Sequence, residues 1–165
     1  YQWAYNGEES NAAIYGRLYT WYAVTDSRNI CPTGWHIPSS ADYFSTLENY
    51  LITNGYNYDG TTSGHKTAKS LGATYRWSSS VNTGVIGNTD FQAKRNASGF
   101  TALPAGTRSY SGSFGSIGDN NALWTNVEMT SSNALYCSLL FFTPVFQSPS
   151  SGNKSNGLSL RCLKD

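Results

Sequence analysis

The sequence predicts one α+β domain spanning residues 1–165, in which two N-terminal helices precede a small, mainly antiparallel twisted sheet with long irregular loops. Two observations favour this class. Apolar residues recur at helical spacing in two stretches of the first third of the chain, and short apolar segments separated by Gly, Ser and Asn turns fill the last third. Helices followed by strands are typical of α+β proteins. A chain of this length buries roughly two-thirds of its unfolded surface, so one core is sufficient.

The first helix is predicted over residues 12–24. The larger residues of this stretch fall at positions i, i+4, i+7 and i+8, which is the stripe of an amphipathic helix: Ile14, Leu18, Trp21 and Tyr22. Gly16 weakens this helix but does not forbid it.

The second helix is predicted to begin after Trp35-His-Ile-Pro. Ser39 and Asp42, three residues apart, have the spacing of a capping box. One helical face follows it, formed by Tyr43, Leu47, Tyr50 and Leu51. Asn54-Gly55 is a typical helix stop.

Residues 55–98 contain turn residues throughout and show weak periodicity. We expect a long, irregular, packed region whose aromatic anchors include Tyr56, Tyr58, Tyr75 and Trp77. A region of this length without regular structure usually carries function or family-specific packing.

Four short strands are predicted after this region, over residues 99–103, 122–128, 135–142 and 158–163. Because side chains alternate along a strand, Leu158, Leu160 and Cys162 share one face of the last strand. Cys162 is therefore expected to point inward.

The stretch 134–146 is the most apolar run in the chain, and it breaks the alternation expected of a strand with one buried face. If Leu139 and Phe141 face the core, the residues of the other parity form an outward row: Tyr136, Ser138, Leu140 and Phe142. An exposed apolar row is typical of a recognition surface. The alternative is that region 55–98 or a neighbouring subunit covers the row.

Composition excludes several classes of function. Eleven Lys plus Arg balance ten Asp plus Glu, and no window gathers the basic residues that nucleic-acid binding requires. No apolar run approaches the ~20 residues of a membrane span, so no membrane insertion is expected. The abundance of Tyr, Trp, Ser, Gly and Asn favours the chemistry of binding loops.

Four motifs carry a family resemblance: Tyr15-Gly-Arg-Leu-Tyr-Thr-Trp-Tyr-Ala-Val, Cys31-Pro-Thr-Gly-Trp-His-Ile-Pro-Ser, Gly99-Phe-Thr-Ala-Leu-Pro-Ala-Gly and Leu160-Arg-Cys-Leu-Lys-Asp. With these motifs the chain resembles the Fibrobacter succinogenes major paralogous domain family. The resemblance implies a C-type lectin-like fold, related in outline to formylglycine-generating domains. The family usually has a strand-bearing segment ahead of the position of Tyr1, so we expect that this segment is missing or that another chain or domain supplies it.

A narrower resemblance concerns the C-terminal part. Ala102-Leu-Pro-Ala-Gly, the 124–128 strand and the ending Asn153-Lys-Ser-Asn-Gly-Leu-Ser-Leu-Arg-Cys look like lectin-like variable proteins of diversity-generating retroelements. In such proteins, adenine-directed mutagenesis diversifies Asn codons. Residues that this process permits stand at Ser111, Ser113, Asn126, Tyr136, Ser138, Leu140, Phe142, Thr143 and Val145. These positions, together with Trp124, are the predicted ligand-binding residues.

Three cysteines, Cys31, Cys137 and Cys162, allow at most one internal disulfide. The family resemblance and the inward direction of Cys162 favour a bridge from Cys31 to Cys162. A bridge over this span is worth on the order of 4 kcal/mol and indicates an oxidising compartment. The alternative is two buried free thiols, and Cys137 is expected to stay free.

Catalysis and metal binding find little support in the sequence. The histidines, His36 and His65, have no spacing that pairs them with a nucleophilic cysteine. No short-spaced Cys or His set suits zinc, and Trp124-Thr-Asn-Val-Glu lacks the paired oxygen ligands of a calcium site. We therefore expect no enzyme activity, no cofactor and no metal.

These inferences predict a noncatalytic, surface-displayed domain that binds a protein or glycan receptor on a cell surface. It would be a variable recognition module of a phage tail fibre, a pilus or a bacterial surface adhesin, and its location would be extracellular, on a cell surface or on a virion. The first alternative is a carbohydrate-binding lectin-like module. The second is a structural subunit whose apolar row mediates homo-oligomerisation.

Overall fold

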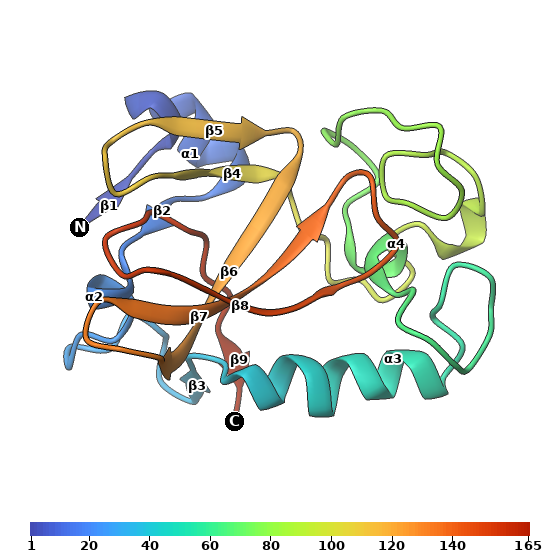
Figure 1. Ribbon diagram of the computed structural model, residues 1–165, viewed down its shortest axis with the longest axis horizontal. Helices are drawn as coiled ribbons and strands as arrows, with labels where there is room; N and C mark the ends of the chain where they lie inside the picture. Colours follow the sequence, from blue (N-terminus) through green and yellow to red (C-terminus); the bar gives the residue numbers. More distant parts are fainter.

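A computed structural model describes residues 1–165, and it shows a mixed α+β architecture with few helices around a curled sheet (Figure 1). The main sheet has the strand order β5-β4-β6-β7-β8, in which β4 and β6 are parallel and the other neighbours are antiparallel. Its strands are β4 (Ala105–Arg108), β5 (Phe114–Ile117), β6 (Asn120–Glu128), β7 (Asn133–Leu140) and β8 (Gln147–Asn153). Two short pairs complete the strands, β1 (Gln2–Trp3) with β2 (Leu18–Tyr19) and β3 (Trp35–His36) with β9 (Leu163–Lys164).

The helix predicted over residues 12–24 is wrong. After a 3-10 turn, η1 (Tyr5–Gly7), the chain forms α1 (Glu9–Tyr15), which ends at Gly16 with φ of 80°. It then forms β2 and a separate helix, α2 (Trp21–Val24). Thr20 caps α2, because its Oγ1 accepts a hydrogen bond from the amide of Ala23 at 3.2 Å. The positive φ of Gly16 and the N-cap at Thr20 thus divide the stretch that the apolar spacing predicted to be one continuous helix.

The predicted capping box of the second helix is present. The amide of Ser39 donates to Oδ2 of Asp42 at 2.7 Å, and the amide of Asp42 donates to Oγ of Ser39 at 3.2 Å. The π-helical η2 (Asp42–Glu48) continues directly into α3 (Asn49–Thr53), and the two form the long helix below the sheet in Figure 1. None of the helices combines the length and the apolar character needed to cross a membrane.

The strand predictions hold for β6 and β7 and fail elsewhere. Residues 99–103 form no strand, because Thr101 has φ of 55° and only Ala102 makes an isolated bridge, to Gly72. Residues 157–159 make isolated bridges to three different segments, so only the last part of 158–163 lies in a strand, β9. β4, β5 and β8 were not predicted, because Gly, Ser, Thr and Asn dominate their sequences.

The hairpin of β6 and β7 divides the molecule. Residues opposite each other in an antiparallel pair share a face. The inner face carries Asn121, Leu123, Cys137 and Leu139, and the outer face carries Asn120, Ala122, Trp124, Tyr136, Ser138 and Leu140. Leu123, Cys137 and Leu139 pack into the main core with the second helix, whereas Ala122 and Trp124 pack against α2. Both faces are therefore covered in part.

Residues 54–104 contain only α4 (Ala68–Leu71) and η3 (Gln92–Lys94) and lie to one side of the sheet (Figure 1, green to yellow). The expected aromatic anchors account for part of its packing: the indole of Trp77 donates to the carbonyl of Ala102 at 3.1 Å, but Tyr75 is 53% exposed. Polar residues do the rest. The Lys69 side chain is buried, and its ammonium donates to Oδ1 of Asp90 at 2.6 Å.

Candidate functional site

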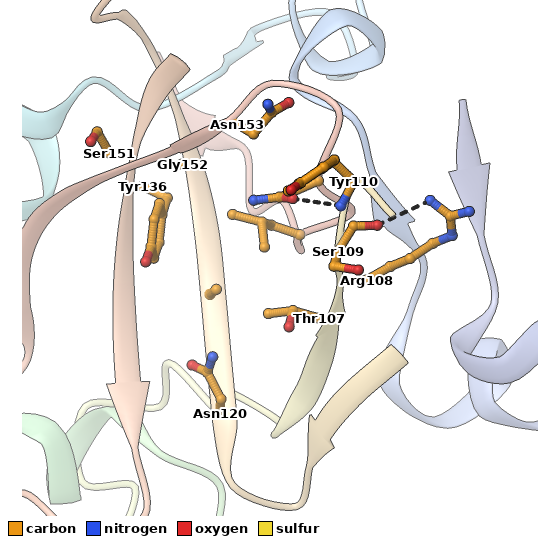
Figure 2. Close-up of a pocket in the computed structure, with 12 residues that line it drawn as sticks. Thr107, Arg108, Ser109, Tyr110, Asn120, Tyr136, Ser151, Gly152 and Asn153 are labelled. Atoms are coloured by element: carbon orange, nitrogen blue, oxygen red, sulfur yellow. Dashed lines mark hydrogen bonds between the residues drawn. The ribbon is translucent and has the colours of Figure 1, made fainter. Parts of the chain in front are cut away.

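A pocket of about 470 Å³ opens on the outer face of the β6–β7 hairpin, between this hairpin, the β4–β5 turn and the end of β8 (Figure 2). Its lining residues all lie between positions 107 and 158: Thr107, Arg108, Ser109, Tyr110, Asn120, Ala122, Tyr136, Ser151, Gly152, Asn153, Asn156 and Leu158. Residues 54–104 contribute nothing to it. The pocket is therefore built on the sheet.

Two tyrosines stand on opposite sides of the pocket (Figure 2). Tyr136 projects from the outer face of β7, where its ring packs edge-on against Trp124 with 6.1 Å between ring centroids. Tyr110 lies in the β4–β5 turn and is 69% exposed. Its amide donates to Oδ1 of Asn156 at 2.8 Å, which fixes the turn against the segment after β8. One ring is thus held by the core, and the other is free to meet a ligand.

Two asparagine residues that line the pocket have side-chain oxygens engaged by backbone amides. Oδ1 of Asn156 accepts from the amide of Tyr110, and Oδ1 of Asn153 accepts from the amide of Ser155 at 2.9 Å. Because each oxygen is engaged, the Nδ2 of each amide remains available as a donor. Asn120, at the other end of the pocket, has a buried Oδ1 without a hydrogen-bond partner. The amides therefore leave hydrogen-bonding capacity unused.

The pocket carries little charge. Arg108 is the one charged residue among those that line it. Its guanidinium lies 4.1 Å from the ring centroid of Trp3, and Nη1 donates to the carbonyl of Ser109 at 3.3 Å. In Figure 2 the side chain turns away from Tyr136. The interior is therefore polar and uncharged, with two aromatic walls.

The outward row of the sequence prediction is split by the structure. Tyr136 lines the pocket, but Ser138 is buried, and Leu140, which ends β7, is half-buried. Phe141 and Phe142 lie in a turn beyond the strand, so strand alternation does not apply to them. Phe142 is nevertheless exposed, as expected, and Phe141 is half-buried. Region 54–104 packs on this turn: the side-chain amide of Asn82 donates to the carbonyl of Phe142 at 3.2 Å.

The other predicted ligand-binding residues scatter. Ser111 and Ser113 lie in the β4–β5 turn next to Tyr110, and Ser111 contacts Oγ of Ser109 at 2.7 Å. Thr143 and Val145 lie in the half-buried segment between β7 and β8. Asn126 is exposed and lies away from the pocket, next to Pro38. Its backbone N–H donates to the Pro38 carbonyl at 2.9 Å.

Trp124 was expected to contact a ligand, and its burial contradicts this. The side chain is completely buried, and its indole N–H donates to the carbonyl of Tyr19 at 2.8 Å. Trp124 therefore supports the pocket through Tyr136 and does not reach its surface.

The free thiol and the two histidines lie outside the pocket. Burial raises the pKa of the free thiol of Cys137 to about 12, so this group stays protonated at neutral pH. Nδ1 of His36 lies 2.7 Å from Oδ1 of Asp165, and Nδ1 of His65 lies 3.2 Å from Oε1 of Glu48. Each histidine thus has a carboxylate partner of its own.

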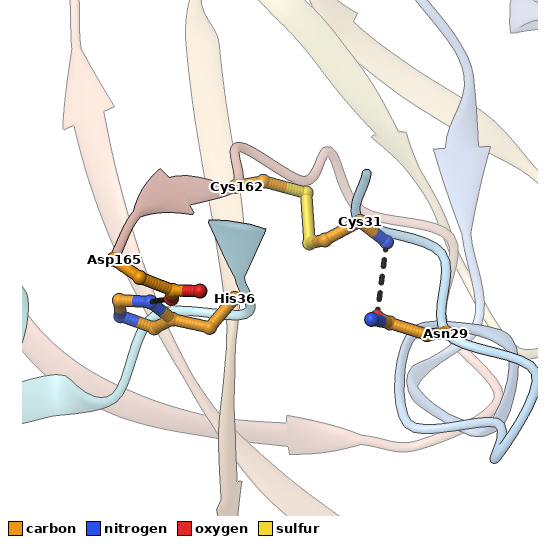
Figure 3. The surroundings of a disulfide bond; sticks show 5 residues. All are labelled: Asn29, Cys31, His36, Cys162 and Asp165. Atoms are coloured by element: carbon orange, nitrogen blue, oxygen red, sulfur yellow. Dashed lines mark hydrogen bonds and ion pairs between the residues drawn. A yellow bond between two sulfur atoms is a disulfide. The ribbon is translucent and has the colours of Figure 1, made fainter. Parts of the chain in front are cut away.

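The disulfide implied by the family resemblance is present between Cys31 and Cys162, 131 positions apart (Figure 3). Next to it, β3 and β9 pair through Trp35 with Lys164 and His36 with Leu163. The C-terminal segment is thereby tied to the N-terminal third of the chain. A crosslink over such a span stabilises by roughly 5 kcal/mol if it acts through the entropy of the unfolded chain.

Comparison with protein families gives one match. The model of the Fibrobacter succinogenes major domain matches residues 1–164. The chain belongs to this family. The match confirms the resemblance carried by the sequence motifs, and it covers both the pocket and the disulfide of this Fibrobacter succinogenes major domain. Comparisons with curated proteins and with solved structures found no match.

Sequence reasoning missed most of the pocket. Asn120, Ser151, Asn153 and Asn156 were not predicted as site residues, although Asn153 and Asn156 stand in the ending motif that carried the narrower resemblance. The signal available was the unusual density of Asn and Ser around positions 148–156. That composition is also typical of a plain turn, and only the pairing of β8 with β7 brings these residues beside Tyr136.

Proposed function

We propose that this Fibrobacter succinogenes major domain is a noncatalytic ligand-binding module whose recognition site is the pocket between Tyr110 and Tyr136. The observation that carries the proposal is the lining: two tyrosine rings, uncharged amides and hydroxyls, and no carboxylate, histidine or cysteine. Concave sites with aromatic walls and a few oriented polar groups are typical of ligand binding. Tyrosine with Ser, Gly and Asn neighbours is also the usual composition of recognition loops.

The lining contains no carboxylate, histidine or thiol, and this favours recognition over turnover. General acid–base catalysis needs a titratable group within hydrogen-bond reach of the substrate. The nearest candidates by type, Cys137 and the two histidines, are buried or paired with carboxylates elsewhere. A ligand in the pocket would meet hydrogen-bond donors, acceptors and ring faces, and no hydroxyl with a histidine or carboxylate in the lining to activate it.

Display outside the cell, as an adhesin or on a tail fibre, pilus or virion, is part of the proposal. The disulfide supports it, because such bonds persist in oxidising environments. A C-type lectin-like fold is proposed from the family resemblance, and the curled mixed sheet with long loops is compatible with it. Diversification by a retroelement would be tested by the flanking DNA, where a reverse transcriptase gene and a near-copy of the region encoding residues 102–165 are expected.

Binding of the labelled domain to a panel of bacterial and host cells tests the proposal. Tyr110→Ser should lower cell binding at least tenfold, because it removes an exposed ring from the pocket without opening the core. Tyr75→Ser is the matched control, since Tyr75 is similarly exposed but lies in region 54–104. Equal binding by the two variants would contradict the proposed site.

A further inference from the structure

We infer that the pocket recognises a neutral, hydroxyl-rich ligand, namely an uncharged glycan, and that it does so without calcium. This inference rests on the proposed function, because it names the ligand class of the same pocket. It draws on three features of the lining: the direction of the amides, the placement of the two rings and the distribution of charge.

The amides select for ligands that accept hydrogen bonds. Asn153 and Asn156 each have Oδ1 occupied by a backbone amide, so each offers Nδ2 as a donor. Thr107 and Ser151 add hydroxyls, which both donate and accept. Asn120 adds a further amide, whose buried oxygen has no hydrogen-bond partner. A ligand hydroxyl both donates and accepts, so adjacent hydroxyls satisfy this mixed set.

The two rings suit the apolar faces of a sugar. Tyr136 is held by Trp124 on one side. On β8, Gly152 lies against the ring, and a Cβ on this glycine would lie only 3.1 Å from Cε1 of Tyr136. The glycine therefore lets β8 approach this ring closely. Tyr110 closes the other side as an exposed ring (Figure 2). Flat rings with a polar hydroxyl pack against C–H faces while remaining hydrated at one edge.

Charge decides between ligand classes. The guanidinium of Arg108 is stacked on Trp3 and turns away from Tyr136, so it is not placed to pair with an anionic ligand in the pocket. This arrangement disfavours ligands with a carboxylate or phosphate group. Calcium takes six to eight oxygen ligands that include charged carboxylates, and no carboxylate lines the pocket. A standard protein interface buries about 800 Å² of surface on each partner, with apolar side chains at its centre. The exposed Phe142 and Met129 lie outside the pocket.

A glycan array probed with the labelled domain in the presence of EDTA tests the inference. Wild-type protein should bind uncharged glycans equally with and without the chelator. Asn156→Asp should weaken this binding about tenfold or more, because the aspartate keeps an acceptor for the Tyr110 amide but replaces the free donor with an acceptor. Asn153→Asp should behave in the same way, with the Ser155 amide still bound.

Asn29→Asp is the matched control. Oδ1 of Asn29 accepts from the amide of Cys31 at 3.2 Å, so this exposed residue undergoes the same chemical change outside the pocket. It should bind glycans like the wild type. Unchanged melting temperatures of Asn153→Asp and Asn156→Asp would show that the loss of binding is not a loss of folding.

The outcomes separate the inference from the proposed function. Loss of glycan binding in EDTA, or binding confined to acidic glycans, would overturn the inference. A protein receptor would also overturn the inference. In that case cell binding would depend on Tyr110, would survive periodate oxidation of cell-surface sugars and would be abolished by protease treatment of the cells. The proposed function would still hold, with a protein as the ligand. Cell binding that Tyr110→Ser leaves unchanged would overturn the proposed site and the inference together.

Discussion

The sheet and the irregular region 54–104 are stabilised by different forces. On the inner face of the hairpin, Leu123 and Leu139 are buried among apolar side chains. In region 54–104 the buried positions include polar residues such as Lys69 and Asn57. The side-chain Nδ2 of Asn57 donates to the carbonyls of three loop residues, and its Oδ1 accepts from the backbone N–H of Lys66. The sheet is held mainly by burial of apolar surface, whereas region 54–104 combines apolar contacts with the main core, such as those of Leu71 and Ile86, with many satisfied polar groups.

This difference bears on where recognition occurs. A long irregular region was expected to carry function, because loops usually do. Here its hydrogen bonds are directed inward, at its own backbone and at the turn after β7, and it contributes nothing to the pocket. The pocket is instead formed by strands and tight turns, where the backbone is fixed by neighbouring strands. The irregular region is better understood as packing that supports the sheet.

The largest expected effect concerns the apolar side of the comparison. Leu139→Ala should lower the free energy of unfolding by about 2–5 kcal/mol, because it leaves a cavity in the core. Leu140→Ala, one position along the same strand but half-buried on the other face, should cost about 1 kcal/mol. Urea unfolding of both variants provides the measurement. Similar losses would mean that the two faces of β7 are not distinct.

The second prediction concerns the buried charge of Lys69 in region 54–104, whose removal should lower the stability of the domain. Lys69→Met keeps the length of the side chain but leaves Asp90 without its partner, so the free energy of unfolding should fall by about 2–3 kcal/mol. Lys164→Met, at an exposed position of β9, should change it by less than about 0.5 kcal/mol. Hydrogen exchange should show the added opening within residues 80–95. Equal stability of the two variants would remove the distinction drawn between the regions.

The smallest effect is a pH dependence. Burial raises the pKa of Glu48, so deprotonation costs folding free energy as pH rises above the usual carboxyl range. Glu48→Gln has no ionisable carboxyl at this position and avoids this cost. Its free energy of unfolding relative to wild type should therefore increase from about pH 4 to pH 7. Thermal unfolding across this range measures the difference. A stability difference that does not change with pH would contradict the assignment for Glu48.

Local signals in the sequence predicted parts of the fold well. The capping box of Ser39 and Asp42 identified the start of the long helix, because both groups lie within one turn of chain. The apolar content of β6 and β7 identified the central hairpin. The same local reasoning failed at Gly16 and Thr20, where helical spacing of apolar residues coincided with a turn and a cap. Periodicity reports which residues repeat, and it does not report the backbone angles between them.

The residues alone were enough to predict the family, the α+β class, the long helix and the central hairpin. The location of the candidate site could be read only from the folded chain. The pocket forms because β4 is the neighbour of β6 in the sheet and β8 is the neighbour of β7, which brings together Tyr110, Tyr136 and Asn156. The sequence of β8 has no apolar alternation from which the strand could be predicted. Strand pairing is made by backbone groups that every residue carries, so side-chain composition alone could not locate the pocket.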